Sequence, residues 1–291
     1  MISRVTNQTL MQTAQRHLQT NLSRLAELQD RASSQKAFTR PSDDPAAAAE
    51  ALRIRGEASA NAQYGRNLSN GGGWLSTLDT ALGSATSLMN EAKDLALQGS
   101  NGSISQAARE ALALGVESVR SELLRHANSS YAGRSVFAGN SDAANAVNPD
   151  LTFNTGGTVE RRLGPNVTLR VDADGEAVFG SGPGSVFTLL DTLAADLRGS
   201  RDVSVHLGAL DARTRAVITQ HSEVGTRHAR LLEARDANAQ QSLALEGRRS
   251  AVEDVDLASV ILDLKMQETA YQSALAVSAR VLQPTLLDFL R

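Results

Sequence analysis

The residues of this chain that could bind a metal are few and widely spaced. His221 and His228 lie seven positions apart and would share one face of a helix, but seven helical residues separate the two rings by roughly 10 Å along the axis. One chain cannot bring both rings to a single ion, and no His-Glu-x-x-His motif supplies a zinc site. We expect these histidines to lie in a helix seam or on the surface, and we predict no metal and no cofactor.

Two glycine-containing segments resemble ligand-binding loops only in part. The segment 172–176, Asp-Ala-Asp-Gly-Glu, hints at a calcium loop, but an EF-hand loop has its glycine at the sixth position and a glutamate at the twelfth. Here the glycine is fourth, and a tight hairpin turn before a strand at 177–179 explains it better. The segment 71–73, three glycines, lacks the Gly-Lys-Ser/Thr ending of a phosphate-binding loop, so we interpret it as a flexible point or a kink.

The remaining chemistry gives no support for catalysis. Cysteine is absent, which excludes disulfides, thiolate nucleophiles and cysteine-ligated zinc. No serine lies in a nucleophile elbow, and the middle of the chain has no paired His, Cys or Ser constellation. We predict that the protein is not an enzyme. The distant alternative is a secreted enzyme with its active site in the middle domain.

Composition favours a bundle of closely packed helices. Only ten of the 291 residues are aromatic, and much of the 41% apolar content is alanine, which lets helices approach one another. The net charge is -3 and no Lys/Arg cluster forms a basic face. No run approaches the roughly 18 apolar residues of a membrane span, and the first residues do not read as a cleavable signal peptide. We therefore expect no nucleic acid partner, no membrane partner and no export by the general secretory route.

Each end of the chain has an amphipathic helical pattern, with apolar residues at steps of three, four or seven. An isolated amphipathic helix has nothing to cover its apolar stripe. We expect the two helices to pair with each other or with neighbouring copies, as in a subunit that polymerises. The first stripe contains Met11, Ala14, Leu18, Leu25, Leu28 and Ala32, and the last contains Leu257, Ile261, Leu264, Tyr271, Leu275 and Leu282.

Two further helices are predicted before the middle of the chain. Asp44 can cap a helix that begins at Pro45, because proline has no N–H to satisfy there. This helix leads into a coiled-coil seam that ends at 99–103, and a second helix reaches about Ser130. The seam contains Leu75, Leu78, Leu82, Ala85, Met89, Ala92 and Ala96, and the second helix carries Leu112, Val116, Val119 and Leu123 on one side.

The middle of the chain, from about residue 131 to 183, is of β type. Alternation over 167–171, followed by Asp174-Gly175, predicts a hairpin whose second strand is 177–179. A short helix is expected over 187–197. The pattern from 207 to 283 then contains no proline, which favours one long helix that three glycines are expected to bend or interrupt. Its heptad positions are Val217, Val224, Leu231, Asn238, Leu245 and Val252, and its glycines are Gly208, Gly225 and Gly247.

The segment Arg40-Pro41-Ser42-Asp43-Asp44-Pro45 precedes an alanine-rich helix. It is the first of several segments that resemble the bacterial flagellin superfamily, and specifically its hook-associated proteins at the hook-filament junction. Flagellins proper read more like Asp-Asp-Ala-Ala-Gly here. On physical grounds alone, Pro41, Ser42, Asp43, Asp44 and Pro45 are a helix start with its cap. The others are Val224 to Arg227 with Leu231, Glu253 to Ala258, and the end, Gln267 to Tyr271, Ala274-Leu275 and Leu286 to Leu290.

The resemblance implies a fold that is mainly α, an elongated helical bundle or coiled coil formed by both termini, with a β-containing middle domain. Its parts would be an N-terminal axial helix and connector at 1–44 and a helical rod domain at 45–130 and 187–256. A β-rich outer domain would occupy 131–186, and a C-terminal axial helix 257–291. The interface for assembly would comprise Met11, Leu18, Leu25, Leu28, Leu257, Ile261, Leu264, Tyr271, Leu275 and Leu282.

The resemblance also implies a function and a location. The chain would be a structural subunit of the bacterial flagellum, secreted by type III export and extracellular, adapting the hook to the flagellin filament. Its partners would be copies of itself in a ring or helical layer, the preceding hook-associated protein, flagellin and an export chaperone. A short flagellin that forms the filament itself is the close alternative.

Overall fold

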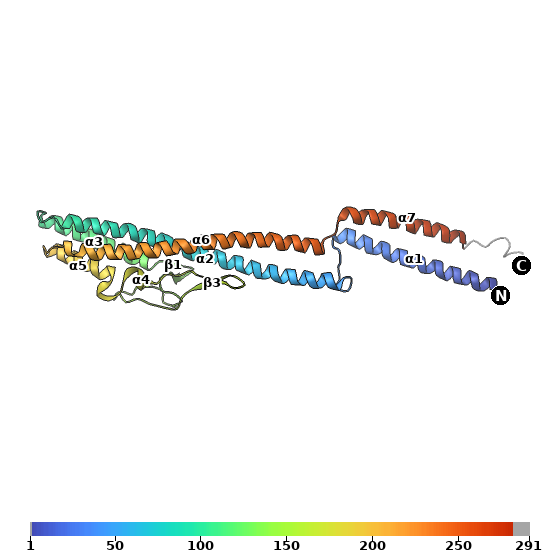
Figure 1. Cartoon of the computed structure of the whole chain (residues 1–291), viewed down its shortest axis with the longest axis horizontal. Helices are drawn as coiled ribbons and strands as arrows, with labels where there is room; N and C mark the ends of the chain where they lie inside the picture. Colours follow the sequence, from blue (N-terminus) through green and yellow to red (C-terminus); the bar gives the residue numbers. More distant parts are fainter. Residues whose placement is uncertain (1, 282–291) are drawn as a thin grey trace. The chain divides into compact units, whose positions relative to one another are not determined.

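The computed structural model describes residues 2–281, and helices account for most of them (Figure 1). The chain forms two compact units, of which unit 1 is Met1–Ser59 with Ser242–Arg291 and unit 2 is Ala60–Gln241. The described strands all lie in the middle of the sequence, within unit 2. The predicted fold class, mainly α with a β-containing middle, is confirmed.

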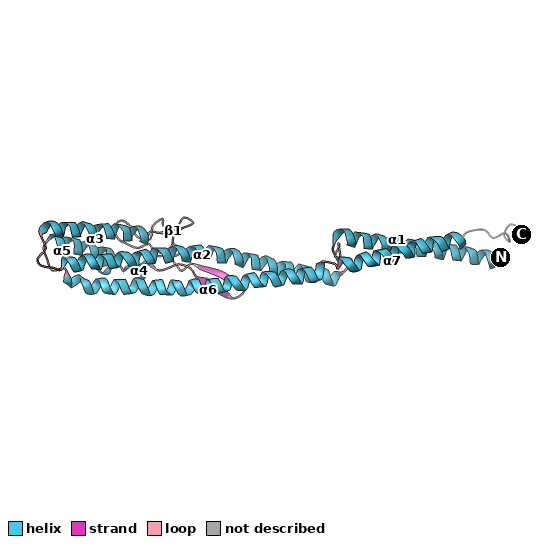
Figure 2. Cartoon of the chain, turned by 90° about the horizontal axis from the view of Figure 1, so that it is seen from above, coloured by secondary structure: helices cyan, strands magenta, loops and turns pink. Residues whose placement is uncertain are grey.

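In unit 1, the first and last described helices pack against each other. Helix α1 (Ile2–Ser34) and helix α7 (Leu257–Val281) lie side by side (Figures 1 and 2). The side-chain amide of Gln267 donates a hydrogen bond to the backbone carbonyl of Asn21 at 3.2 Å. The predicted pairing of the two terminal helices with each other is therefore confirmed within the chain.

The long helix predicted for 207–283 is divided in two, and this prediction was wrong. Helix α6 (Leu207–Glu253) ends three residues before α7 begins. The break does not fall at Gly208, Gly225 or Gly247, all of which are helical. It falls at an aspartate cap: the Asp256 carboxylate accepts a hydrogen bond from the backbone N–H of Ala258 at 3.0 Å, and such capping favours a helix start.

The core of unit 2 is formed by the packing of long helices. Helix α2 (Pro45–Gly99) presents the predicted seam, and every residue from Leu75 to Ala96 in that seam is buried. Helices α3 (Gln106–Ala127) and α5 (Val186–Arg198) pack against each other beside it. The heptad positions of α6 within unit 2 are buried at Val217, Val224 and Leu231. The coiled-coil spacing thus predicted the helical core correctly.

A reciprocal pair of asparagines occupies the next heptad position of α6. Asn238 donates from its side-chain amide to the Asn61 carbonyl oxygens, and Asn61 donates in return to the Asn238 backbone carbonyl. A Cβ at Gly65 would lie 3.1 Å from the Asn238 side-chain oxygen. The glycine leaves room for this amide pair, which satisfies polar groups inside a helix seam.

The middle of the chain forms two small antiparallel sheets. Strands β1 (Ser130–Tyr131) and β2 (Arg134–Ser135) pair in one, and β3 (Glu160–Gly164) and β4 (Val167–Arg170) pair in the other. The predicted partner of the strand at 167–171 was wrong, because β4 pairs with β3 before it and the segment 177–179 is helical. Asp174 instead caps the short helix α4 (Gly175–Phe179), accepting from the Glu176 N–H at 3.0 Å. Two short 3₁₀ turns, η1 (Gly182–Gly184) and η2 (Ser204–His206), flank α5.

The three glycines at 71–73 do not form a flexible point or a kink, and this prediction was also wrong. They continue α2 without interruption, with Gly71 buried. A Cβ built on Gly73 would lie 2.3 Å from the ring of Tyr131, which packs against Trp74 with ring centroids 6.2 Å apart. The missing side chain therefore admits a tyrosine from β1 to the surface of α2.

We expect Gly73→Ala to destabilise the protein by about 1 to 3 kcal/mol, because the new methyl group must displace the Tyr131 ring. Gly72→Ala is the matched control, since its Cβ would make only ordinary contact, 3.7 Å from the nearest Leu231 atom. The control should be neutral or stabilising by up to about 1 kcal/mol through helix propensity. Urea unfolding followed by circular dichroism measures both, and equal effects of the two substitutions would contradict the close approach.

Candidate assembly interface

The predicted motif from Pro41 to Pro45 forms a turn and a helix cap. The Asp43 carboxylate accepts hydrogen bonds from the backbone N–H groups of Arg40, at 2.9 Å, and Thr39, at 3.3 Å. The bond from Arg40 is the main reason that the pKa of Asp43 lies below its ordinary value. Asp44 accepts from the N–H of Ala47 at 2.9 Å, which caps the first turn of α2 where Pro45 has no N–H.

The connector after α1 pairs with the break between α6 and α7. The backbone N–H of Ala37 donates to the Glu253 carbonyl at 2.8 Å, and the N–H of Val255 donates to the Gln35 carbonyl at 3.3 Å. The Lys36 ammonium lies 2.6 Å from an Asp254 carboxylate oxygen. The two places where the chain leaves its helices in unit 1 therefore hold each other by backbone and charged contacts.

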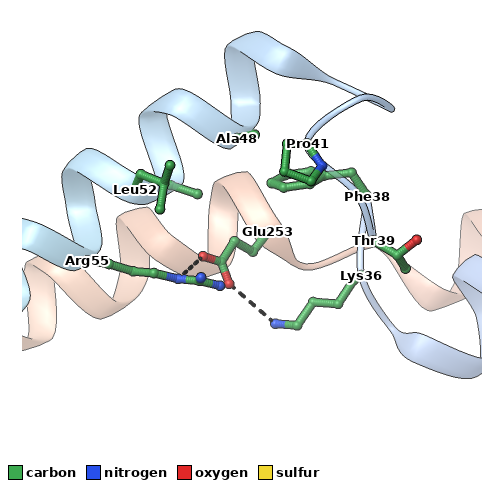
Figure 3. Close-up of a pocket in the computed structure, with 9 residues that line it drawn as sticks. Lys36, Phe38, Thr39, Pro41, Ala48, Leu52, Arg55 and Glu253 are labelled. Atoms are coloured by element: carbon green, nitrogen blue, oxygen red, sulfur yellow. Dashed lines mark ion pairs between the residues drawn. The ribbon is translucent and has the colours of Figure 1, made fainter.

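A buried carboxylate lies at the centre of this crossing. Glu253 is only 4% exposed, and its oxygens lie 2.9 Å from Arg55 Nε, 3.2 Å from Arg249 Nη1 and 3.7 Å from Lys36 Nζ. Figure 3 shows Arg55 and Lys36 reaching this carboxylate from α2 and from the connector. The close approach of the Arg55 guanidinium is the main cause that lowers the pKa of Glu253. Three cations thus offset the cost of burying one negative charge.

An apolar groove of about 440 Å³ opens beside this carboxylate. Phe38 and Pro41 of the connector face Ala48 and Leu52 of α2 across it (Figure 3). Leu52 is largely exposed to solvent. Apolar side chains form most of the lining, so the groove is suited to holding an apolar side chain.

The structure separates the predicted interface residues into two groups. Leu18, Leu25 and Leu28 of α1 and Leu264 and Tyr271 of α7 are half-buried, so their partial burial needs no second subunit. The others described are exposed, and Leu282, like the motif segment at 286–290, lies outside the described residues. The exposed members are Met11, Leu257, Ile261 and Leu275.

The packed face of α7 differs from the predicted stripe by a small rotation. Its least exposed described positions are Val260, which is 8% exposed, and Ser278. Polar Gln267 shares this face, which explains why a search for apolar spacing selected the neighbouring stripe instead. The less exposed positions of α7 are Val260, Leu264, Gln267, Glu268, Tyr271, Ala274 and Ser278.

Helix α7 also carries large exposed apolar side chains outside its packed face, which the predicted stripe does not include. At 100° per residue, Leu262 lies opposite the packed face. Met266 and Val277 lie at the flank of that face, where they line grooves beside α1. Leu262 and Val277 are each 62% exposed and Met266 is 56% exposed. A helix that is apolar on several sides is typical of one covered on several sides, and exposed apolar clusters mark interaction surfaces.

Two of the five histidines lie beside carboxylates. His221 Nε2 lies 2.9 Å from Asp79 Oδ1, and His206 Nε2 lies 2.8 Å from Asp196 Oδ2. Across residues 2–281, no group of three or more His, Asp or Glu side chains is placed to hold a metal ion. None of the helices in this range is long and apolar enough to cross a membrane.

Comparisons with known proteins agree with this arrangement. The family described as the bacterial flagellin N-terminal helical region matches residues 5–142. Flagellar hook-associated protein 3 of Salmonella typhimurium is 26% identical over 275 residues, which cover 85% of this chain and 87% of that protein. The chain therefore contains a flagellin-type N-terminal region. Its likeness to hook-associated protein 3 extends over most of its length.

Two further relatives define the extent of the likeness. Polar flagellin F of Vibrio parahaemolyticus is 34% identical, but over 127 residues that cover 43% of this chain and 34% of that flagellin. The solved structure of a putative flagellar hook-associated protein from Vibrio parahaemolyticus has the same fold, with a TM-score of 0.68 and 24% identity. The match covers 73% of this chain and 100% of the chain in that solved structure. The fold of that solved structure therefore extends over most of this chain.

We expect Glu253→Gln to lower the free energy of unfolding by about 2 kcal/mol, because a neutral amide loses the charge-assisted bonds to Arg55 and Arg249. Glu246→Gln is the control: this carboxylate also pairs with Arg249, at 2.6 Å, but is well exposed. Exposed ion pairs contribute little, so the control should unfold like wild type. A Glu253→Gln protein as stable as the control would show that the buried cluster does not stabilise the crossing.

The lowered pKa of Glu253 sets the pH range in which the cluster contributes to stability. In the unfolded chain the Glu253 carboxyl group has its ordinary, higher pKa. The contribution of Glu253 to the free energy of unfolding is therefore complete above the unfolded pKa and is lost as pH falls through the folded pKa. The stability difference between wild type and Glu253→Gln should therefore be constant near neutral pH and should shrink in acid. Urea titrations over a pH series measure it, and a difference that grows in acid would contradict the assigned sign.

Proposed function

We propose that this chain is a structural subunit of the bacterial flagellum that adapts the hook to the flagellin filament. The observation that supports this most is the likeness to a flagellar hook-associated protein over 85% of the chain. The exposed apolar side chains of α7 give the proposal a physical basis. Leu262, Met266 and Val277 would leave water only when another chain covers them.

The terminal helices would form the assembly contact. α1 and α7 already pair within one chain, so each subunit would present a preformed helix pair to its neighbours. The interface would consist of the exposed predicted residues together with Leu262, Met266 and Val277 of α7. Contacts between unlike surfaces that do not close in a plane generate a helical layer. The segments 1–44 and 257–291 would be axial, the rod would comprise 45–130 and 187–256, and 131–186 would lie outside.

The proposal also includes partners and a route. The subunit would contact copies of itself, the preceding hook-associated protein and flagellin, and it would leave the cell by flagellar type III export with a chaperone. It would work outside the cell at the hook-filament junction, and it would not be an enzyme.

A short flagellin that forms the filament is the alternative, favoured by the 34% identity to a polar flagellin over 127 residues. Fluorescent labelling of this chain in intact flagella separates the two. A junction subunit labels a single point next to the hook, whereas a flagellin labels the whole filament. Label along the whole filament would reject the junction proposal and support the alternative.

We expect Leu262→Asp with Met266→Asp to abolish assembly without unfolding the monomer. Both side chains are exposed in the single chain, so the change costs the monomer little, but in an assembled layer it would place two charges in a dry contact at several kcal/mol. Leu264→Asp is unsuitable for this purpose because Leu264 is half-buried against α1. Circular dichroism, secretion into the medium and motility of complemented cells measure the outcome.

The matched control is Gln272→Asp, a charge placed at an exposed polar position of the same helix. It should leave both folding and motility close to wild type. Cells with the double substitution should build hooks without stable filaments and should release flagellin into the medium. Normal motility with the double substitution would show that Leu262 and Met266 are not covered in the assembly.

A further inference from the structure

The loop between α2 and α3 contains the sequence Asn101-Gly102-Ser103, and the sequence has one other Asn-Gly pair, Asn70-Gly71. Asn101, Gly102 and Ser103 are all exposed. The side-chain oxygen of Asn101 accepts hydrogen bonds from the Ser103 hydroxyl at 2.7 Å and from the Ser103 N–H at 3.2 Å. Two donors thus withdraw electron density from the Asn101 side-chain carbonyl, as donors do for a developing oxyanion.

The nitrogen that could attack this carbonyl is available. Within the described residues, the backbone N–H of Gly102 makes no hydrogen bond, and nothing lies within 4 Å of where a Cβ on Gly102 would be. Glycine also gives the chain the backbone freedom needed to close a five-membered ring. An activated carbonyl and an unengaged amide nitrogen therefore lie on adjacent residues.

We propose that Asn101 is a site of spontaneous deamidation, with water as the co-reactant. Solvent hydroxide removes the proton from the Gly102 nitrogen, which bonds to Asn101 Cγ. The bond from Cγ to Nδ2 breaks, and Nδ2 takes a proton from water and leaves as ammonia. Water then opens the resulting succinimide at either carbonyl, leaving aspartate or isoaspartate. No electron transfer is involved. The product places a new negative charge close to the Ser105 cap of α3.

The second Asn-Gly pair serves as an internal control. Asn70 Oδ1 also accepts a hydrogen bond, from Arg161 Nε at 2.8 Å, so its carbonyl is polarised too. Gly71, however, is buried within α2, where its N–H belongs to the helix ladder and the backbone has no room to close the ring. The state of the glycine nitrogen distinguishes the two sites, and only Asn101 should react in the folded protein.

Peptide mapping of the full-length protein tests the inference. Trypsin cuts after Arg66, Lys93 and Arg109, so the two pairs fall on separate peptides, 67–93 and 94–109. After incubation in mildly alkaline buffer, isoaspartate should accumulate in 94–109 and not in 67–93. In denaturant both peptides should react at similar rates. Reaction of 67–93 as fast as 94–109 in the folded protein, or no reaction of 94–109 when its denatured form reacts, would overturn the proposal.

Ser103→Ala tests the activation by the hydroxyl. In the folded protein it should slow the reaction of Asn101 by roughly fivefold, the rate equivalent of one ordinary hydrogen bond, and in denaturant it should have no effect. Circular dichroism checks that this exposed substitution leaves the fold intact. Equal folded rates with and without the hydroxyl would contradict the assigned role of Ser103.

Discussion

Unit 1 depends on a single crossing, where a buried carboxylate holds together two segments that are far apart in the sequence. Glu253 is surrounded by Lys36, Arg55 and Arg249, which come from the connector, α2 and α6. Backbone hydrogen bonds between 35–37 and 253–255 complete the contact. Because a buried charge is tolerated only when it is paired and hydrogen-bonded, these residues must meet for the terminal helices to begin and end where they do.

This crossing explains in physical terms why aspartates occur in the segments near both ends of the chain that resemble the flagellin superfamily. Asp43 closes the turn that precedes α2, and Asp44 caps the helix. Asp254 pairs with Lys36, and Asp256 caps α7. Each aspartate therefore satisfies backbone or charged donors where a helix starts or where two connectors cross.

Local spacing predicted the helices well, because their apolar positions repeat along one segment. The seam from Leu75 to Ala96 and the repeat through Val217, Val224 and Leu231 are buried as the period requires. The break after Glu253 was not predictable in this way, since it depends on Lys36, which lies 218 residues from Asp254. The role of Gly73 was likewise not predictable from local spacing, because it depends on the close approach of Tyr131, which is distant in the sequence.

The assembly surface shows a different limit of sequence reasoning. Helix α7 is apolar on several sides, so more than one stripe satisfies helical spacing, and the choice between them depends on the partner helix. We infer that another subunit covers Leu262 in the working flagellum. Because the chain has no cysteine, a single Leu262→Cys provides a clean probe of this position. We predict rapid maleimide labelling of the monomer and strong protection in intact flagella, whereas equal labelling in both would contradict the account.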